Sequence, residues 1–170
     1  MNRNVEKFVQ SLQQQFGATL EEFRGETHVF LRAEHILTAL LQAREAQQFE
    51  LLSAMTAVDY WPRQKPRFHI IYQLSSLANN VTLQFRVALE AGRTSLPTAS
   101  VIYEAANWRE REIAEMFGIS FDGHPDPRPL MLPPEITEPP LRRDVPLGYE
   151  EPQFTFNFDE IDLRKPYAKE

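Results

Sequence analysis

The chain has 170 residues, of which 42% are hydrophobic and 25% charged, and this composition suits one folded domain of ordinary size. Its 18 Lys and Arg stand against 24 Asp and Glu, so the formal net charge is −6 and nucleic acid is not an expected partner. The sequence has no cysteine, which excludes disulfides, thiolate zinc sites, cysteine-ligated iron–sulfur clusters and a cysteine nucleophile from this chain. Any redox role would therefore depend on groups that other proteins carry.

The N-terminal residues begin directly with a helical pattern. Apolar residues recur there at steps of three and four: Val5, Phe8, Val9, Leu12 and Phe16. This narrow stripe predicts a helix that faces a core, in preference to one that lies on a membrane surface. No apolar signal segment precedes it, and no run of about 20 apolar residues follows. We therefore expect an intracellular chain without direct membrane insertion.

Later segments alternate between strand and helix patterns. Gly25 separates two short alternating segments, residues 18–24 and 27–32, which predict a strand pair. Strong helix formers and an apolar face predict a second helix over residues 34–47, and residues 98–118 predict a third helix that Gly118 ends. The apolar face of the second helix is expected to contain Ile36, Leu37, Leu40 and Leu41. Three further segments are rich in β-formers: residues 49–57, 67–74 and 80–89.

This order predicts an α+β fold, in which about three helices pack on a mixed or antiparallel sheet. Ten of the 13 prolines lie between Pro125 and Pro166, so a long proline-rich extended segment is expected to follow. We predict a globular domain over residues 1–124 and a tail over residues 125–170. The tail keeps many apolar residues, so we expect it to dock partly on its own domain and partly on other subunits, and to be mobile in isolation.

Few residues suggest a cofactor or a catalytic centre. The four histidines have no metal-type spacing among them, and the dispersed glycines form no phosphate-binding loop. The run Glu110-Arg111-Glu112, with Glu115, is the most unusual helical feature. One interpretation is a solvated face with pairs such as Arg111 to Glu115. A second is an ion pair at the join between helix and tail, with Arg111 or Glu112 buried.

The residues from Glu110 to Met131, EREIAEMFGISFDGHPDPRPLM, carry a family resemblance. This stretch resembles the signature of the respiratory-chain NADH dehydrogenase thirty-kilodalton subunit family. Trp108 precedes the charged triplet as in that family, and residues 56–60 and 140–149 resemble two further blocks of it. By this resemblance the signature and subunit-interface residues are Trp108, Glu110, Arg111, Glu112, Glu115, Phe117, Gly118, His124, Pro125, Arg128, Arg142, Arg143, Asp144 and Tyr149.

The resemblance implies a structural and assembly role in the peripheral arm of proton-translocating NADH:quinone oxidoreductase, or complex I. Members of the family bind no cofactor, so NADH, FMN, iron–sulfur clusters and quinone are expected on partner subunits. The implied partners are the quinone-site subunit and neighbouring iron–sulfur subunits, on the cytoplasmic side of the membrane. No residue of this chain is expected to be catalytic or to bind a cofactor or metal. The electron donor stays open, because related subunits occur in membrane-bound hydrogenases and ferredoxin-dependent quinone reductases.

The residues alone leave one different class of function open. Glu112 and His124 could serve as acid and base in a small free-standing enzyme. No nucleophile lies near them in sequence, so the assembly role is the favoured hypothesis.

Overall fold

The structure is a computed structural model, and it describes residues 3–133 and 136–145. Its elements follow in chain order: α1 (Arg3–Phe16), β1 (Thr19–Phe23), β2 (Glu26–Leu31), the 3-10 helix η1 (Ala33–His35), α2 (Ile36–Gln47), β3 (Leu51–Asp59), β4 (Phe68–Ser76), β5 (Val81–Leu89), β6 (Ser95–Pro97), α3 (Ala106–Phe117) and β7 (Ser120–Asp122).

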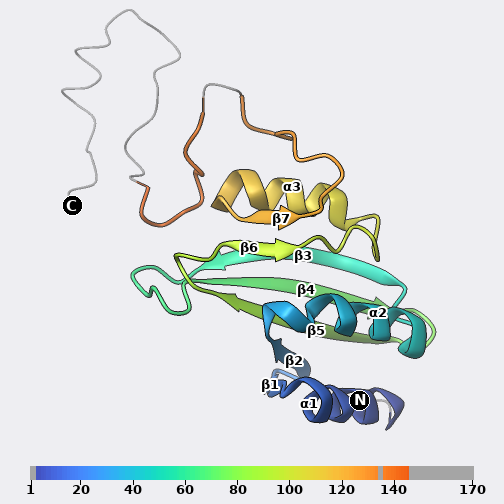
Figure 1. Ribbon diagram of the computed structural model, residues 1–170. Helices are drawn as coiled ribbons and strands as arrows, with labels where there is room; N and C mark the ends of the chain where they lie inside the picture. Colours follow the sequence, from blue (N-terminus) through green and yellow to red (C-terminus); the bar gives the residue numbers. More distant parts are fainter. Residues whose placement is uncertain (1–2, 134–135, 146–170) are drawn as a thin grey trace, which may run out of the picture.

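Five strands form one mixed sheet in the order β1-β2-β5-β4-β3 (Figure 1). The β2–β5 pair is parallel, and the other three pairs are antiparallel. The short strands β6 and β7 make a second, parallel sheet next to α3. The predicted α+β class, with a mixed sheet and three helices, is therefore confirmed.

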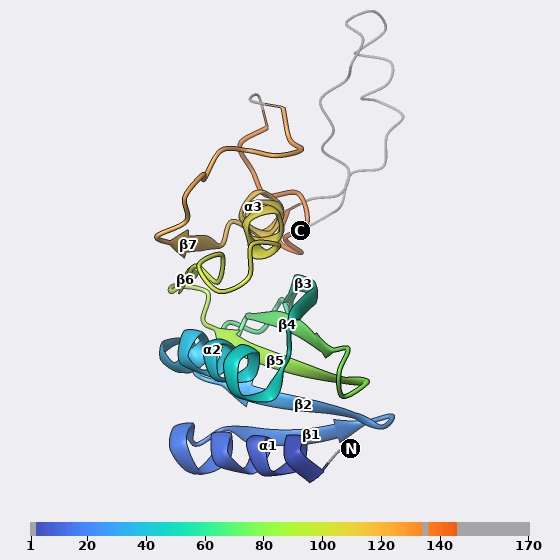
Figure 2. The same cartoon turned by 90° about the vertical axis from the view of Figure 1, so that its right-hand side faces the viewer.

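The core lies between the large sheet and its helices. Alternate residues of β4, Phe68, Ile70, Tyr72 and Leu74, are fully buried, whereas the residues between them are partly exposed. This period of two assigns one face of the sheet to the core. Figure 2 shows α2 on one side of the sheet and α3 above the edge strand β3. Loops and α3 thus gather at the β3 edge.

The N-terminal prediction is confirmed, because Val5, Phe8, Val9 and Leu12 of α1 are buried in the core. The strand pair around Gly25 is also confirmed as the antiparallel pair β1–β2. In α2 the expected apolar face is wrong at one position. Leu41 is exposed, whereas small alanines complete the buried face. At about 100° per residue, positions 36, 39, 40 and 43 lie within one arc, and position 41 lies outside it.

The third helix starts later than predicted. α3 begins at Ala106 instead of residue 98, and residues 99–105 form turns. Thr98 Oγ1 accepts a hydrogen bond from the Ser100 N–H at 3.1 Å, a side-chain contact that competes with helical pairing. The strands β6 and β7 were not predicted, because three residues are too few to show an alternating pattern.

The described part of the C-terminal segment crosses α3. We call residues 124–133 and 136–145 the strap. It runs along α3 from the first turn of the helix toward the last. At that end the Leu141 N–H donates to the Met116 carbonyl oxygen at 3.0 Å. The division at residues 124 and 125 stays a prediction, as does the extended tail. Tyr149 and the rest of residues 146–170 lie outside the described residues.

Candidate functional site

The signature residues lie on α3 and on the strap that follows it. Gly118 ends the helix with φ +68°, and its N–H donates to the Ala114 carbonyl oxygen at 3.0 Å. A Cβ at this position would meet Pro139 Cγ at 2.9 Å. Glycine is therefore required twice here, by the left-handed backbone and by the returning strap.

Glu110 occupies a core position of α3 and is fully buried. Its Oε1 accepts a hydrogen bond from the Ala99 N–H at 2.6 Å, and its Oε2 accepts one from Thr98 Oγ1 at 2.5 Å. Burial raises the pKa of Glu110 above its usual value, although both hydrogen bonds and nearby His124 oppose that rise. The carboxylate thus joins α3 to the turn that follows β6.

His124 begins the strap and is almost completely buried. Its Nε2 lies 3.0 Å from the Asn107 carbonyl oxygen, and its Nδ1 accepts a hydrogen bond from the Asp126 N–H at 3.1 Å. This pattern requires a proton on Nε2 and a lone pair on Nδ1. Nε2 also lies 3.8 Å from Oε2 of Glu110. His124 therefore connects the first turn of α3 to the start of the strap.

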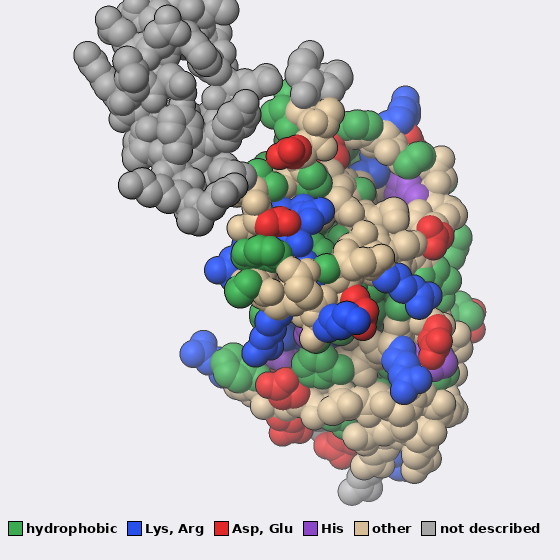
Figure 3. Space-filling model, turned by 60° about the vertical axis from the view of Figure 1, so that its left-hand side comes forward, with side chains coloured by type: hydrophobic (Ala, Val, Ile, Leu, Met, Phe, Trp, Pro, Cys, Tyr) green, Lys and Arg blue, Asp and Glu red, His purple; other side chains and the backbone are tan. Residues whose placement is uncertain are grey.

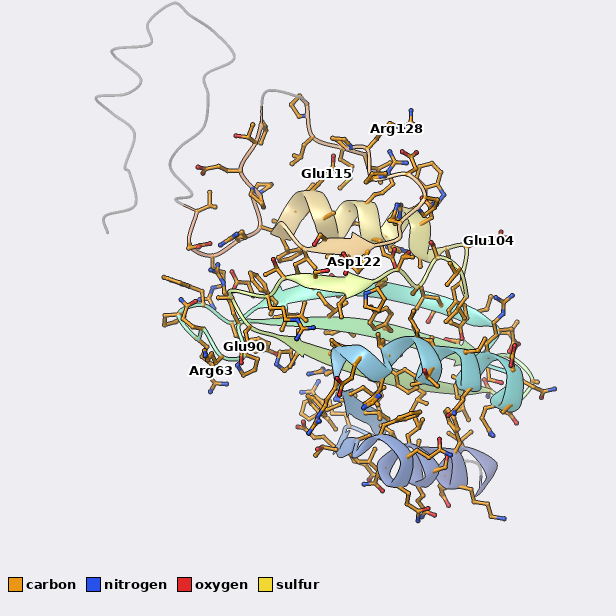
Figure 4. The ribbon with its side chains drawn as sticks, in the orientation of Figure 1. Arg63, Glu90, Glu104, Glu115, Asp122 and Arg128 are labelled. Carbon is orange, nitrogen blue, oxygen red and sulfur yellow. The ribbon has the colours of Figure 1, made fainter. Side chains whose placement is uncertain are left out.

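Arg111 and Glu115 hold the next part of the strap. Arg111 donates from Nε to the Arg128 carbonyl oxygen at 2.8 Å and from Nη2 to the Pro129 carbonyl oxygen at 3.0 Å. Its Nη1 also reaches Oδ2 of Asp126 at 3.4 Å. The Glu115 carboxylate accepts hydrogen bonds from the backbone N–H groups of three successive residues, Leu130, Met131 and Leu132. Figure 4 shows Glu115 on the side of α3 that faces the strap.

A second group of contacts, which we call the Arg67 clasp, holds the C-terminal end of the strap to the large sheet. Arg67, immediately before β4, donates to both carboxylate oxygens of Asp59 at 3.1 and 2.9 Å. It donates to both oxygens of Asp144 at 3.0 and 2.6 Å. The side chains of Arg67 and Asp59 are 3% and 1% exposed, and that of Asp144 is 27% exposed. Such bidentate pairs fix geometry as well as adding energy.

The surroundings complete this clasp. The Arg67 guanidinium lies over the rings of Trp61 and Phe68, with Cζ at 4.9 and 4.7 Å from their centroids. Burial alone would raise the pKa of Asp59, but hydrogen bonds from Arg67 and from the Arg143 and Trp61 N–H groups outweigh it, so the pKa is lowered. Hydrogen bonds from Arg67 and then Arg142 lower the pKa of Asp144.

The structure corrects the interpretations of the charged run. Arg111 and Glu115 form no pair with each other among the described contacts, because each binds the strap. The hypothesis of a buried group is wrong for Glu112, and Arg111 is only partly buried, with a side chain that is 10% exposed. Glu112 is 45% exposed and pairs with Arg109 at 3.9 Å. Glu110 is the buried carboxylate, and its spacing from apolar Ala106 and Ile113 was the signal for it.

The remaining predicted residues have varied positions. Trp108 is 60% exposed under the Arg111 guanidinium, and Phe117 is partly buried against the core. Pro125 is exposed, and exposed Arg128 pairs with Asp126 at 2.6 Å. The Arg143 side chain is exposed. Sequence reasoning missed Arg67 and Thr98, whose roles depend on contacts between distant segments.

One cavity of about 310 Å³ lies beside the buried pair of Glu110 and His124, and Ala114, Ile119 and Phe121 supply apolar walls. Within residues 3–133 and 136–145, no group of three or more His, Asp or Glu could hold a metal ion. No helix in the same residues is long and apolar enough to cross a membrane. The polar groups that line this region are already paired within the chain.

The fold and the site together define a small mixed α+β protein in which charged residues hold the strap against α3 and the large sheet. Residues 29–151 match the family model described as respiratory-chain NADH dehydrogenase, 30 Kd subunit, and the chain belongs to this family. The family resemblance of the signature is thereby confirmed.

Similarity to individual members supports this assignment to the family. The chain is 40% identical over 151 residues to the NADH-quinone oxidoreductase C subunit of Roseiflexus sp. (strain RS-1), and the match covers 88% of this chain and 86% of that protein. It is 34% identical over 139 residues to the C subunit from Geobacter sulfurreducens, covering 80% of this chain and 86% of that protein. Among solved structures, the trypsin-resistant fragment (1–134) of Nqo5 is similar, with a TM-score of 0.64 and 29% identity, covering 72% of this chain and 98% of the fragment.

A second solved structure extends the comparison. A chain of the membrane-bound sulfane sulfur reductase, an archaeal respiratory membrane complex, has a TM-score of 0.63 and 25% identity. The match covers 83% of this chain and 81% of that chain.

Proposed function

We propose that this chain is a non-catalytic subunit of a proton-translocating NADH:quinone oxidoreductase, in which it supports assembly of the peripheral arm. Its family membership and its relatives named as the C subunit of NADH-quinone oxidoreductase support this role. One observation carries the proposal: most of the charged signature residues bind a backbone or side-chain partner in the strap. These residues therefore shape a surface.

That surface combines α3 with the strap. Five large apolar side chains are exposed on it, namely Trp108, Leu130, Met131, Ile136 and Leu141, with exposed fractions from 37% to 60%. The hydrogen bonds of Arg111, Glu115 and Arg67 hold the backbone near Leu130, Met131 and Leu141. Exposed aromatic and apolar side chains on a rigid frame are typical of the central part of an interface. We propose that the quinone-site subunit and neighbouring iron–sulfur subunits bind here, on the cytoplasmic side of the membrane.

We propose that electron transfer in the complex takes place on those partner subunits. With no cysteine and no described metal-ligating cluster, the chain offers no ligand set for iron–sulfur. We propose that NADH, FMN, the clusters and quinone are bound by partner subunits and that no residue of this chain is catalytic. The acid/base alternative is not favoured, because both ring nitrogens of His124 are used within the chain and Glu112 pairs with Arg109 on the helix surface.

Co-purification from the native organism tests the proposal. We expect the tagged chain to bring down iron–sulfur and quinone-site subunits, and the chain purified alone to be colourless and free of metal in elemental analysis. Recovery of the chain alone under conditions that preserve the membrane complex would contradict the assembly role. Stoichiometric metal in the isolated chain would contradict the assignment of cofactors to partners.

The similarity to the sulfane sulfur reductase chain favours one second candidate, a subunit of a related respiratory complex with another electron donor, such as a membrane-bound hydrogenase or a ferredoxin-dependent quinone reductase. The electron-input subunits in the same preparation distinguish the two. NADH oxidation coupled to quinone reduction supports the first candidate. A complex that lacks NADH oxidation and accepts electrons from ferredoxin or hydrogen supports the second.

A further inference from the structure

The large sheet has one face that no described helix covers, as Figure 2 shows on the side opposite α2. The strand register places two adjacent rows of side chains on this face. Val58, His69 and Ala88 form one row. Thr56, Ile71, Arg86 and Phe30 form the next, across β3, β4, β5 and β2. We call these seven residues the open face.

The centre of the open face is partly apolar. His69 packs edge-on against the rings of Tyr60 and Phe30, at centroid distances of 4.8 and 6.2 Å. Val58 and Ile71 are each only partly exposed. Nδ1 of His69 is buried and has no hydrogen-bond partner within the described part of the chain.

The same region is positively charged. The Arg86 guanidinium lies 5.8 Å from the centre of the Phe30 ring and donates to Gln84 Oε1 at 2.6 Å. Among the residues described, neither Arg86 nor Arg63 has a carboxylate within salt-bridge distance, whereas neighbouring Lys65 pairs with Glu90 at 3.6 Å. Burial lowers the pKa of His69, and the positive charges of Arg86 and Arg63 lower it further.

Two figures show this side of the molecule. In Figure 4, Arg63 and Glu90 project from the same end of the sheet. The space-filling view turns the left-hand side of the molecule forward, and blue basic, green apolar and red acidic side chains are interspersed there (Figure 3).

We propose that the open face is a second docking surface, separate from α3 and the strap, and that it binds an acidic, partly apolar polypeptide segment of a partner subunit. A carboxylate of that segment would pair with Arg86, and its apolar side chains would pack on Val58, Ile71 and Phe30. The argument is charge complementarity. An arginine that is half-buried over an aromatic ring without a counter-charge gains a charge-assisted hydrogen bond when an acidic partner binds. This inference rests on the proposed role as a subunit.

Single cysteine substitutions test the proposal, because the natural chain has no cysteine and an introduced thiol is unique on it. Ala88→Cys places a thiol at an exposed position of the open face, and Glu45→Cys places one at an exposed position of α2. Each variant is labelled with a maleimide as free chain and within the purified complex, and the label on this subunit is read by mass spectrometry.

We expect the thiol of the Ala88→Cys variant to react about tenfold more slowly in the complex than in the free chain, because the core of an interface excludes solvent. The thiol of the Glu45→Cys variant should react at the same rate in both states. Equal rates at position 88, in a complex that otherwise assembles, would overturn the second surface and leave the proposed function intact. Slow labelling in the free chain that rises on deletion of residues 146–170 would instead identify the chain's own C-terminal segment as the occupant, and would also overturn the proposal.

Charge reversal gives an independent arm. Arg86→Glu should reduce recovery of this subunit in the complex by about tenfold, because two acidic groups would then face each other. Lys7→Glu, an equal change of charge at an exposed position of α1, should leave recovery unchanged. Equal recovery of both variants would overturn the acidic partner. Failure of the natural chain itself to co-purify with any subunit would count against the proposed function instead.

Discussion

Nη2 of Arg67 lies 2.6 Å from Oδ1 of Asp144, a residue 77 positions later in the chain. Arg67 immediately precedes β4 and also holds buried Asp59 at the end of β3, so one guanidinium joins the large sheet to the strap. The end of the strap is therefore held to the large sheet by a buried ionic group.

Arg67→Met should be strongly destabilising. It leaves the buried carboxylate of Asp59 with backbone donors only, and removal of one partner of a buried pair costs roughly 3–5 kcal/mol. Arg128→Met is the matched control, because Arg128 also pairs bidentately with an aspartate but is exposed. Chemical denaturation of both variants measures the difference. Similar free energies of unfolding for the two variants would show that burial of Arg67 does not matter.

Asp144→Asn should change how the free energy of unfolding depends on pH at acid pH. The pKa of Asp144 is lowered in the folded chain, so the unfolded chain binds a proton more readily and stability rises with pH in this range. The stabilisation is fully present above the usual aspartate pKa of about 3.9 and is lost as pH falls through the lowered folded value. The gap in unfolding free energy between natural chain and variant should thus shrink below about pH 4. A gap that is constant from pH 3 to pH 7 would contradict the ion pair.

Glu110→Gln should act in the opposite direction. The pKa of Glu110 is raised by burial, so the folded chain binds the proton more readily and loses stability as pH rises through that pKa. Glutamine retains an oxygen to accept from the Ala99 N–H, and its amide can donate to Thr98 Oγ1. Relative to the natural chain, the variant should therefore gain in unfolding free energy as pH rises. Denaturant titrations at several pH values check this, and a relative loss at higher pH would refute it.

Gly118→Ala and Gly17→Ala can be compared directly, because both replace a glycine at the end of a helix. Both glycines have positive φ, +68° and +62°, so each alanine incurs a backbone cost of roughly 1–2 kcal/mol. Only at Gly118 would the new Cβ also meet an atom, Pro139 Cγ at 2.9 Å, whereas nothing lies within 4 Å at Gly17. Gly118→Ala should therefore have the lower melting temperature of the two. The reverse order would show that the returning strap does not press on the end of α3.

Arg111→Ala should impair assembly more than Glu112→Ala. Arg111 holds the Arg128 and Pro129 carbonyl oxygens, so its loss releases the segment that carries Leu130 and Met131. Glu112 makes one long, half-exposed pair, which contributes at most about 1 kcal/mol. Native gels should show less assembled complex for Arg111→Ala, with quinone reductase turnover per assembled complex unchanged. Normal assembly with a large loss of turnover would instead indicate a direct role in electron or proton transfer.

Much of the fold is predictable from local pattern. The stripe of α1, the alternation of β4 and β5, and the order of helices and strands each depend on residues close in sequence, so periodicity finds them. Periodicity fails where the element is too short, as in β6 and β7, or where side chains compete with helical hydrogen bonds, as at Thr98 and Ser100.

By itself the sequence determined the family, through the spacing from Glu110 to Arg128, and the lack of cysteine ligands. It did not determine which charge of the triplet is buried. Only the tertiary structure decided that Glu110 faces the core, that Arg111 and Glu115 bind the strap instead of each other, and that Arg67 joins Asp59 to Asp144. The physical reason is distance along the chain. Glu110 is satisfied by Ala99, 11 residues away, and Asp59 by Arg143, 84 residues away. Such partners leave no short-range pattern, and burial then decides whether a charge is solvated or must be paired.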